Sequence, residues 1–277
     1  MPEGPEIRLA ADRVERALQG ETVSDISFAF EHLKIFEPRL KGRRVEAVET
    51  RGKALLIHFE RSLTVYSHNQ LYGRWLIARA GHLPDTRRQL RLAIHNHRKS
   101  ALLYSASDIA VLTPTQVQTH PFLSRLGPDV LSSTPDQIVG QLESDRFRRR
   151  RFSSLFLDQH FVAGIGNYLR SEILFVAGLH PRLRPVDCTG AQLGTLAHAA
   201  IAVAEQSYRH AGVTTDLEIA RRLKAEGQRY GRYRHWVFGR AGCSCRRCGS
   251  KIVQDVAASR RIYHCTGCQL PTAAAAG

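Results

Sequence analysis

The residues with the clearest chemical potential stand at the start of the chain, in Met1-Pro2-Glu3-Gly4-Pro5-Glu6. Removal of Met1, which a small residue at position 2 permits, would leave Pro2 with a free secondary amine. Free α-amino groups titrate near pH ~8, so a useful fraction is neutral and nucleophilic near pH ~7. Such an amine could attack an aldehyde carbon and form an iminium, while the Glu3 carboxyl moves protons. Pro2 and Pro5 would equally suit the first turn of a helix, so this stretch alone leaves both interpretations open.

The second chemical pattern is Cys245-x2-Cys248-x16-Cys265-x2-Cys268. Each Cys-x2-Cys pair can wrap a metal ion, and two pairs complete a tetrahedral thiolate shell for zinc without an open position. We therefore expect one structural Zn²⁺. Cys243 competes with Cys245, which we prefer because it alone gives symmetric two-residue spacing.

Between the two cysteine pairs, residues 252–263 have the pattern of a β-hairpin. A module this small cannot bury a core of its own, so metal binding would supply its folding free energy, on the order of 10 kcal/mol. Cys188 lies apart from the other cysteines and reads as an ordinary thiol, and His264 is not needed as a ligand.

Three shorter stretches could contact a polyanion. Lys53 follows Arg51-Gly52 before an expected strand and could point into a cleft or simply into solvent. Gln70-Leu71-Tyr72 could be an exposed wedge that fills a duplex after a base is extruded, or a strand edge with one buried face. Asn167 ends the glycine turn 164–167 at a helix start, where backbone N–H groups favour phosphate, although plain turn chemistry would also explain it.

Composition agrees with an anionic partner. The 277 residues carry a net charge of +15 and a pI near 10.1, which favours nucleic acid, although a generally basic enzyme would look the same. No apolar run approaches 18 residues and no signal peptide is evident, so we expect no membrane partner and a cytoplasmic location, with nucleoid association when bound to DNA. We also expect a monomer, without a nucleotide or redox cofactor.

The elements that must position these residues change period along the chain. Residues 5–19 have helical spacing, and residues 23–112 alternate in short apolar runs typical of antiparallel strands. Beyond a boundary near residues 113–121 the pattern becomes helical, with helices expected at 135–142, 152–161, 168–176 and 189–209. Residues 216–234 are polar and basic, and we expect a partly mobile linker there.

The predicted fold is multidomain α+β. An antiparallel β-sandwich with a packed N-terminal helix would occupy residues 1–118, and a helical domain containing a helix-two-turn-helix would occupy residues 119–234. A four-cysteine zinc-finger β-hairpin would follow at 235–270, and a disordered tail at 271–277.

The order of these motifs makes the chain similar to one family. The N-terminal Pro-Glu-Gly-Pro-Glu, Lys53 after Arg51-Gly52, the turn 164–167 and the terminal finger resemble the formamidopyrimidine-DNA glycosylase/endonuclease VIII family of DNA glycosylase/AP lyases. The resemblance covers nearly the whole chain and is weakest at residues 216–234. The consecutive Gln-Leu-Tyr and the N-terminal motif look like the endonuclease VIII branch, whose typical substrates are oxidised pyrimidines.

The resemblance implies a bifunctional enzyme of base excision repair that acts on damaged double-stranded DNA and cleaves the strand by β,δ-elimination. Pro2 would form the Schiff base with C1′ of the damaged nucleotide, Glu3 would act as acid and base, and Lys53 would assist protonation and elimination. The residues implied to contact DNA are Gln70, Leu71, Tyr72, Arg125 and Asn167. Arg260 would grip phosphates beside the lesion and aid the final elimination, with its neighbour Arg261 ranked second.

Two other functions stay open at this stage. A purine-directed relative would excise 8-oxoguanine or formamidopyrimidines with the same residues, and residues 216–234 lie where such relatives place a loop over the flipped purine. A zinc-ribbon nucleic-acid-binding protein without enzymatic activity would make the N-terminal motif, Lys53 and the wedge triplet coincidences.

Overall fold

The computed structural model describes residues 2–271, so all but the first residue of the expected tail 271–277 lies outside the described residues. The chain forms two compact units. The first contains Pro2 and Glu6–Arg125, and the second contains Glu3–Pro5 and the residues from Leu126 on.

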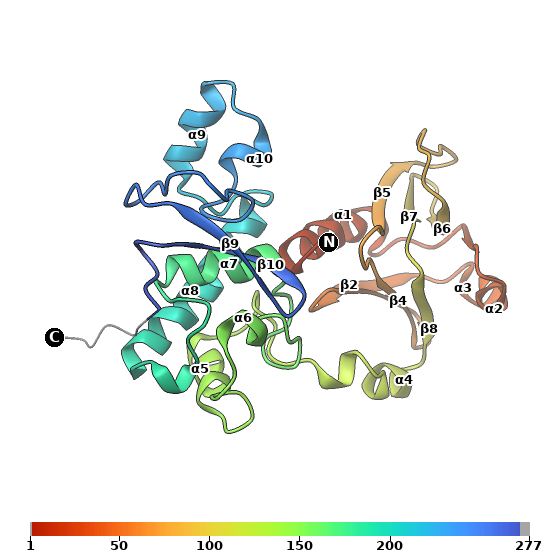
Figure 1. Cartoon of the computed structure of the whole chain (residues 1–277). Coiled ribbons are helices and arrows are strands. Elements are labelled where there is room, and N and C mark those ends of the chain that lie inside the picture. The colour runs from red at the N-terminus through yellow and green to blue at the C-terminus, as the bar shows by residue number, and fades with distance from the viewer. Residues whose placement is uncertain (1, 272–277) are drawn as a thin grey trace. The chain divides into compact units, whose positions relative to one another are not determined.

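The first unit is a β-sandwich of two antiparallel four-stranded sheets (Figure 1). One sheet has the order β2-β3-β4-β8, formed by Val45–Arg51, Ala54–Phe59, Leu63–His68 and Asp108–Leu112. The other has the order β1-β6-β7-β5, formed by Asp25–Phe28, Leu90–His95, Lys99–Tyr104 and Arg74–Arg79. The alternation in the sequence therefore predicted the sandwich correctly.

Helix α1 (Gly4–Leu18) packs its apolar side chains into the core of this sandwich. Ile7, Ala11, Val14 and Leu18 recur at helical spacing, and all four are buried. Two short helices follow β1, namely α2 (Glu31–Lys34) and α3 (Glu37–Leu40). The helix expected over residues 5–19 is thus confirmed, and its first residues lead directly back to Pro2 and Glu3.

The interruption expected at residues 113–121 is a short helix, α4 (Pro114–Thr119), followed by the 3₁₀ turn η1 (Leu123–Arg125). Thr113 caps α4, because its hydroxyl accepts the Gln116 N–H while the Gln116 side chain accepts the Thr113 N–H. This reciprocal capping box starts a helix at the boundary where the strand pattern ends.

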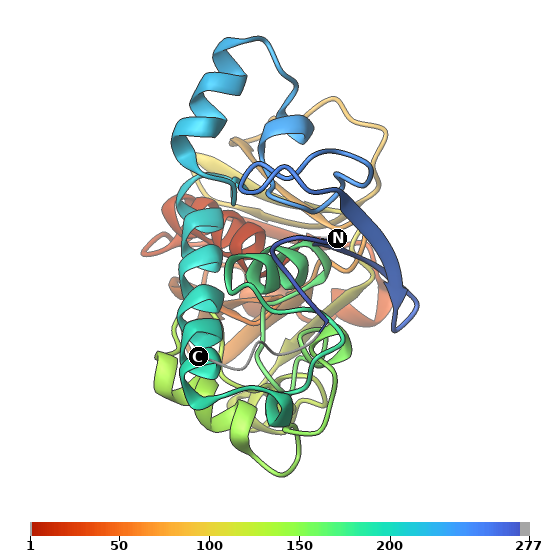
Figure 2. The same cartoon turned by 60° about the vertical axis from the view of Figure 1, so that its left-hand side comes forward.

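The second unit is mainly helical (Figure 2). Helix α7 (Asn167–Val176) and helix α5 (Pro135–Glu143) both pack against the long helix α8 (Gly190–Arg209). Thr134 and Thr189 cap α5 and α8 through capping boxes. The remaining short elements are α6 (Phe152–Leu155) and the 3₁₀ turn η2 (Pro185–Asp187).

Two predictions for this unit were wrong. The helix expected at residues 152–161 ends with α6, because the Asp158 carboxylate accepts the His160 N–H and pairs with Arg150, which fixes a turn instead. The linker expected at residues 216–234 contains two helices, α9 (Leu217–Ala225) and α10 (Tyr230–Tyr233). Asp216 starts α9 by accepting the N–H groups of Glu218 and Ile219, a cap that the sequence already contained.

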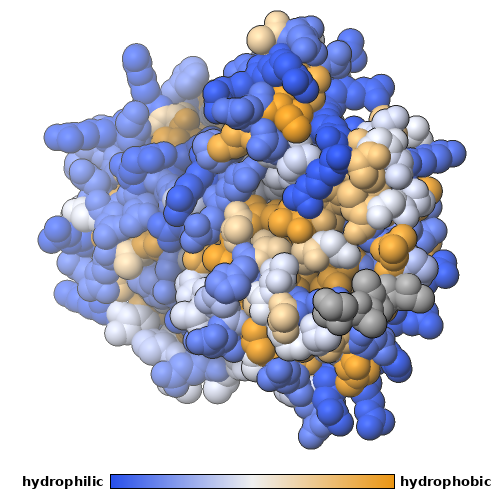
Figure 3. Space-filling model, turned by 90° about the vertical axis from the view of Figure 1, so that its left-hand side faces the viewer, coloured by the Kyte–Doolittle hydropathy of each residue, from blue (hydrophilic) through white to orange (hydrophobic). Residues whose placement is uncertain are grey.

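The expected hairpin is formed by β9 (Ile252–Ala257) and β10 (Arg260–Cys265), which pair antiparallel. Its two-residue turn, Ala258-Ser259, has positive φ at both positions, which matches the right-handed twist of the strands. On the face of the molecule in Figure 3, hydrophilic residues cover most of the surface and hydrophobic ones lie in patches between them. Among residues 2–271, no helix combines the length and apolar character needed to cross a membrane.

Candidate functional site

The carboxylate of Glu3 lies in a cradle of backbone N–H groups at the start of α7. Glu3 is 2% exposed. Its oxygens accept hydrogen bonds from the N–H groups of Gly166 (2.7 Å), Tyr168 (2.8 Å) and Leu169 (3.2 Å). Free N–H groups and the helix dipole both favour an anion at this position. The cradle therefore fixes a buried carboxylate one residue after Pro2.

Gly166 is what allows Glu3 to reach this helix end. A Cβ added at Gly166 would lie 2.5 Å from Cδ of Glu3, far inside van der Waals contact. The neighbouring turn also holds the chain start, because the Gly4 N–H donates to the Gly164 carbonyl at 2.8 Å. Gly164 adopts a φ of 91°, a conformation that favours glycine. The glycines of the 164–167 turn thus have a steric reason that the sequence alone did not give.

Arg170 is a buried cation that connects this helix end to the β9–β10 hairpin. Its guanidinium donates to the Asn167 side chain (2.7 Å), to the Arg261 carbonyl (3.0 Å) and to the Ser153 carbonyl. Burial lowers the pKa of Arg170 to about 10, and the charge of Glu3 opposes that fall while Arg260 adds to it. Arg170 stays protonated at neutral pH. Sequence reasoning missed it, although its position three residues after Asn167 on one helix face was a signal.

Of the predicted site residues, Glu3, Asn167 and Arg260 belong to the second unit. Asn167 is the first residue of α7, and Arg260 is the exposed first residue of β10. Arg261 is also exposed, but its carbonyl is held by Arg170. Both hairpin arginines therefore present their side chains to solvent beside a backbone that a buried cation anchors.

Lys53 and the wedge triplet belong to the first unit, as does Arg125, which is exposed at the end of η1. Lys53 is buried in the turn between β2 and β3. The pKa of the neighbouring His68 is lowered mainly by burial. The charge of Asp108 opposes this shift, and the positive charge of Lys53 adds to it. A buried lysine whose charge acts on a neighbouring imidazole differs from the solvated turn residue that was the alternative interpretation.

The triplet Gln70-Leu71-Tyr72 forms the turn between β4 and β5. Leu71 is 55% exposed and Tyr72 is 67% exposed. Gln70 has a φ of 47°, its N–H donates to His68 Nδ1 at 3.1 Å, and its side-chain oxygen accepts from Ser107 at 2.8 Å. The backbone of this turn is held while its apolar side chains face solvent, which argues against a strand edge with a buried face.

The four cysteines of the finger come together. The sulfur atoms of Cys245, Cys248, Cys265 and Cys268 all lie within 4.8 Å of one another. The sulfur of Cys268 is 3.8 Å from that of Cys245 and 3.3 Å from that of Cys248. Zinc–sulfur bonds of ~2.3 Å in a tetrahedron would separate the sulfurs by ~3.8 Å, so the cluster has the size of a four-thiolate metal site. Cys243, the competing ligand, is not part of it.

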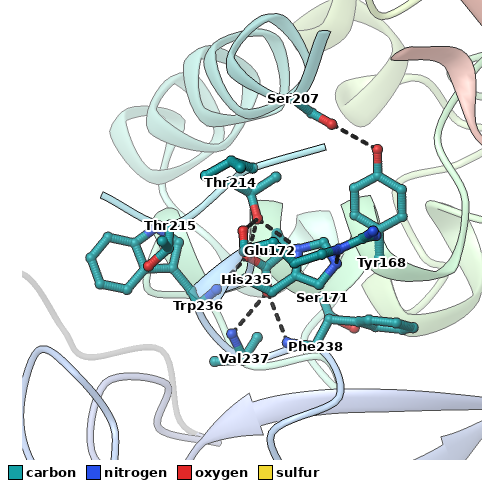
Figure 4. Close-up of polar contacts among 12 residues, drawn as sticks. Tyr168, Ser171, Glu172, Ser207, Thr214, Thr215, His235, Trp236, Val237 and Phe238 are labelled. Atoms are coloured by element: carbon teal, nitrogen blue, oxygen red, sulfur yellow. Dashed lines mark hydrogen bonds and ion pairs between the residues drawn. The ribbon is translucent and has the colours of Figure 1, made fainter. Parts of the chain in front are cut away.

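A second buried carboxylate, Glu172, lies on the same helix as Asn167 and Arg170. Figure 4 shows Glu172 among its polar partners. It accepts the N–H groups of Trp236, Val237 and Phe238 at 2.7–2.9 Å and the Thr214 hydroxyl at 2.5 Å. Burial raises the pKa of Glu172, and these hydrogen bonds oppose the rise. Glu172 therefore joins α7 to the chain segment that enters the finger.

His235 completes this cluster. Its Nε2 lies 2.6 Å from Arg234 Nε, which can only donate, so Nε2 accepts and Nδ1 carries the proton. Nδ1 then donates to Thr214 Oγ1 at 2.9 Å, and the Thr214 proton is directed to Glu172. Burial first, and then the charges of Arg234 and Arg246, hold the pKa of His235 well below its usual value. The imidazole is neutral, and no sequence pattern indicates this contact, since Thr214 and His235 are 21 positions apart.

Comparisons with known proteins agree with this architecture. Residues 1–106 match the model of the formamidopyrimidine-DNA glycosylase N-terminal domain, and residues 126–218 match that of the formamidopyrimidine-DNA glycosylase H2TH domain. Endonuclease 8 of Salmonella arizonae is 48% identical over 272 residues, covering 97% of this chain and 100% of the relative. Endonuclease 8 of Escherichia coli K12 / DH10B has the same identity and coverage.

Among solved structures, a complex between the Lactococcus lactis Fpg and DNA containing an abasic site has the same fold, with a TM-score of 0.79. The match covers 97% of this chain and 99% of that one at 19% sequence identity. The fold of this chain, with its two four-stranded sheets and its helical unit, is thus a known one.

Proposed function

The chain belongs to the formamidopyrimidine-DNA glycosylase family, and within the DNA glycosylase and AP lyase activity of base excision repair we propose that it removes oxidised pyrimidines. The lesion preference is supported by the 48% identity to endonuclease 8 relatives over nearly the whole chain and by the exposed Gln70-Leu71-Tyr72 turn. The single observation that carries the chemistry is the N–H cradle that fixes the Glu3 carboxylate directly after Pro2.

Pro2, freed by removal of Met1, is the proposed nucleophile. Its nitrogen bonds to C1′ of the damaged nucleotide, and the base departs with the electron pair of the glycosidic bond and a proton. The sugar ring then opens as its oxygen leaves C1′ and takes a proton, which produces an iminium. Glu3 is the proposed group that moves these protons, because it is the carboxyl next to the amine and its position is fixed.

Strand cleavage follows from the iminium without a metal or redox step. The iminium acidifies the C2′ proton, and loss of that proton expels the 3′ phosphate. Loss of the C4′ proton then expels the 5′ phosphate, and hydrolysis releases the amine. We assign assistance in protonation and elimination to Lys53, whose buried position keeps its ammonium from being a freely solvated surface charge.

The DNA-binding residues proposed from the sequence fall into two groups. Leu71 and Tyr72 would fill the space of the extruded nucleotide, and Gln70 would hydrogen-bond the orphaned partner base. Arg125, Asn167 and Arg260 would hold phosphates. For Asn167 the support is its place at a helix start and its bond to Arg170, which fixes the amide.

The cysteine cluster is proposed to hold one structural zinc ion through Cys245, Cys248, Cys265 and Cys268. Bound zinc would cross-link the two ends of the hairpin and so supply folding free energy to the segment that carries Arg260. With four protein ligands, the ion would have no open position for substrate.

We further propose that the protein acts as a monomer on damaged double-stranded DNA and associates with the nucleoid. The net charge of +15 supports an interaction with duplex phosphates. That charge also predicts strong salt dependence of binding.

Paired assays test the proposal. Purified enzyme is incubated with otherwise identical duplexes that contain thymine glycol or 8-oxoguanine, and the products are resolved on a sequencing gel. The proposal expects faster cleavage at thymine glycol, with phosphate left at both ends of the gap. Faster cleavage at 8-oxoguanine would make the enzyme purine-directed, and binding without cleavage of either duplex would remove the enzymatic assignment.

A further inference from the structure

A cavity of about 390 Å³ lies in the first unit and is lined by residues from the second half of α1 and from strand β5. Its lining combines two chemistries. Three cations, Arg13, Arg16 and Lys99, stand beside the apolar side chains of Trp75, Leu76 and Ile77. None of these residues has a role in the glycosylase chemistry proposed above.

The cations of this cavity have no counter-charge within the described part of the chain. Among residues 2–271, the side chains of Arg13, Arg16 and Lys99 form neither an ion pair nor a hydrogen bond. Arg8 on the same helix behaves differently, because it pairs with Asp12 at 2.8 Å and with Glu15 at 3.2 Å. Helix α1 therefore neutralises one of its arginines and leaves two others facing a cavity.

Trp75, which lines the cavity, also has an unsatisfied polar group. It is 5% exposed, and within the described residues its indole N–H has no hydrogen-bond partner. An orphaned buried donor costs ~1–3 kcal/mol, so such groups are uncommon unless something else satisfies them. Trp75 lies on β5, the edge strand of its sheet, which has a ladder partner on one side only. Edge strands are common sites of peptide addition.

We propose that this cavity, defined by Arg13, Arg16, Lys99 and Trp75, docks an acidic peptide segment of a partner protein that carries an apolar side chain beside its carboxylates. Carboxylates would pair with the three cations, and the apolar side chain would pack on the apolar lining that Trp75 and Ile77 contribute from one face of β5. A DNA backbone offers evenly spaced phosphates but no apolar group for that lining. The mixture of free cations and apolar surface is why a peptide is favoured over nucleic acid.

The test uses full-length protein and a fluorescein-labelled peptide, Asp-Asp-Glu-Leu-Phe, with a free C-terminus. Two control peptides keep the length: Asn-Asn-Gln-Leu-Phe amide lacks the charges, and Asp-Asp-Glu-Gly-Ser lacks the apolar end. Binding is measured by fluorescence anisotropy to the parent and to two charge-matched variants. R13E/R16E reverses the charge of two cations in the cavity, whereas R61E/R87E reverses the charge of two exposed arginines elsewhere in the same unit. K99E replaces R13E/R16E if melting curves show that the double variant does not fold.

The proposal expects saturable binding of the acidic-apolar peptide, at least tenfold weaker binding of both control peptides, and at least a tenfold loss in R13E/R16E but not in R61E/R87E. The ¹H–¹⁵N signal of the Trp75 indole, identified by its absence in W75F, should shift when the peptide binds. Cleavage of damaged duplex should be equal in the two variants.

Equal peptide binding by both variants, or no saturation by 1 mM peptide, would overturn the proposal. A selective loss of duplex binding and cleavage in R13E/R16E would also overturn it, because the cavity would then be a DNA contact. These outcomes leave the glycosylase assignment unchanged, since that rests on activity of the parent protein.

Discussion

The second unit contains two buried carboxylates that are held almost identically. Glu3 and Glu172 are 2% and 0% exposed, and each accepts hydrogen bonds from three backbone N–H groups. For Glu3 these groups come from the start of α7, whereas for Glu172 they come from Trp236, Val237 and Phe238. The first turn of α7 thus binds the Glu3 carboxylate, and the middle of the same helix carries the Glu172 carboxylate.

The difference between the two lies in what surrounds the carboxylates. Glu172 also accepts a hydrogen bond from the Thr214 hydroxyl, and that hydroxyl accepts one from His235 Nδ1. Arg234 donates to His235 Nε2, so each hydrogen bond of this cluster has an assigned donor and acceptor. Glu3 is adjacent in sequence to Pro2, the proposed nucleophile. Three N–H donors therefore do not by themselves identify a catalytic acid. The neighbouring reactive group separates the proposed catalytic carboxyl from the anchoring one.

Exchanging each carboxylate for its amide should separate the two roles most strongly. Glu3→Gln should lower base excision by the folded protein at least ~100-fold, because the proton-moving group is lost, and it should also lower the free energy of unfolding, because an NH₂ group replaces one of the oxygens that accept the three backbone N–H groups. Glu172→Gln should leave much of the activity of the folded protein but lower the free energy of unfolding by about 3 kcal/mol, because a buried acceptor of four hydrogen bonds is lost. Single-turnover excision and urea unfolding measure the two effects. An exchange of these phenotypes would reverse the roles.

A single methyl group should damage the Glu3 cradle without touching a functional group. Gly166→Ala would place a Cβ 2.5 Å from Cδ of Glu3, so the carboxylate must move and excision should fall ~10-fold or more. Gly190→Ala is the matched control, because a Cβ there meets nothing within 4 Å at the start of another helix. If Gly166→Ala excises thymine glycol as fast as Gly190→Ala, the position of Glu3 does not matter for the reaction.

Thr214→Val probes the anchor while keeping the shape of the side chain. The variant removes the hydroxyl that donates to Glu172 and accepts from His235, so the free energy of unfolding should fall by about 2 kcal/mol. At a temperature where the variant is folded, its rate of base excision should stay within about threefold of the rate of the parent, because the Glu172 cluster stabilises the fold and Glu3 is the proposed catalytic carboxyl. A loss of excision without a loss of stability would place the Glu172 cluster in the catalytic machinery.

The sequence predicted what depends on local patterns. The helix at 5–19, the alternation of 23–112 and the Cys-x2-Cys pairs all encode structure within a few residues. The two wrong segments failed where a side chain outweighed the pattern: Asp158 fixes a turn, and Asp216 starts a helix in the stretch where we expected a partly mobile linker.

The contacts of Arg170, Glu172 and His235 could not be predicted in this way. Their long-range contacts join residues far apart in the sequence: 21 positions separate His235 from Thr214, and 91 separate Arg170 from Arg261. Only the fold brings such residues together. The steric need for Gly166 has the same origin, because the group that fills its missing Cβ is Glu3.

The smallest expected effect concerns the pH dependence of stability. Because the pKa of His235 is depressed in the folded state, His235 binds a proton below pH ~6.5 in the unfolded chain but not in the folded protein. Above that pH, His235 does not make the free energy of unfolding depend on pH. Below it, the free energy of unfolding falls by up to ~1.4 kcal/mol for each unit by which the pH decreases. His235→Phe should remove this slope between pH 6.5 and 5.5 in urea unfolding curves. Parallel curves for parent and variant would show that His235 titrates equally in both states.

The central claim, that the Pro2 amine attacks C1′, is tested most directly by borohydride trapping followed by mass spectrometry of the cross-linked peptide. Enzyme, duplex containing thymine glycol and borohydride are mixed, and the adduct is digested and sequenced. The account predicts a stable cross-link on the nitrogen of Pro2 as the first residue, with Met1 absent. A cross-link on Lys53, or an active enzyme that quantitatively retains Met1, would contradict it.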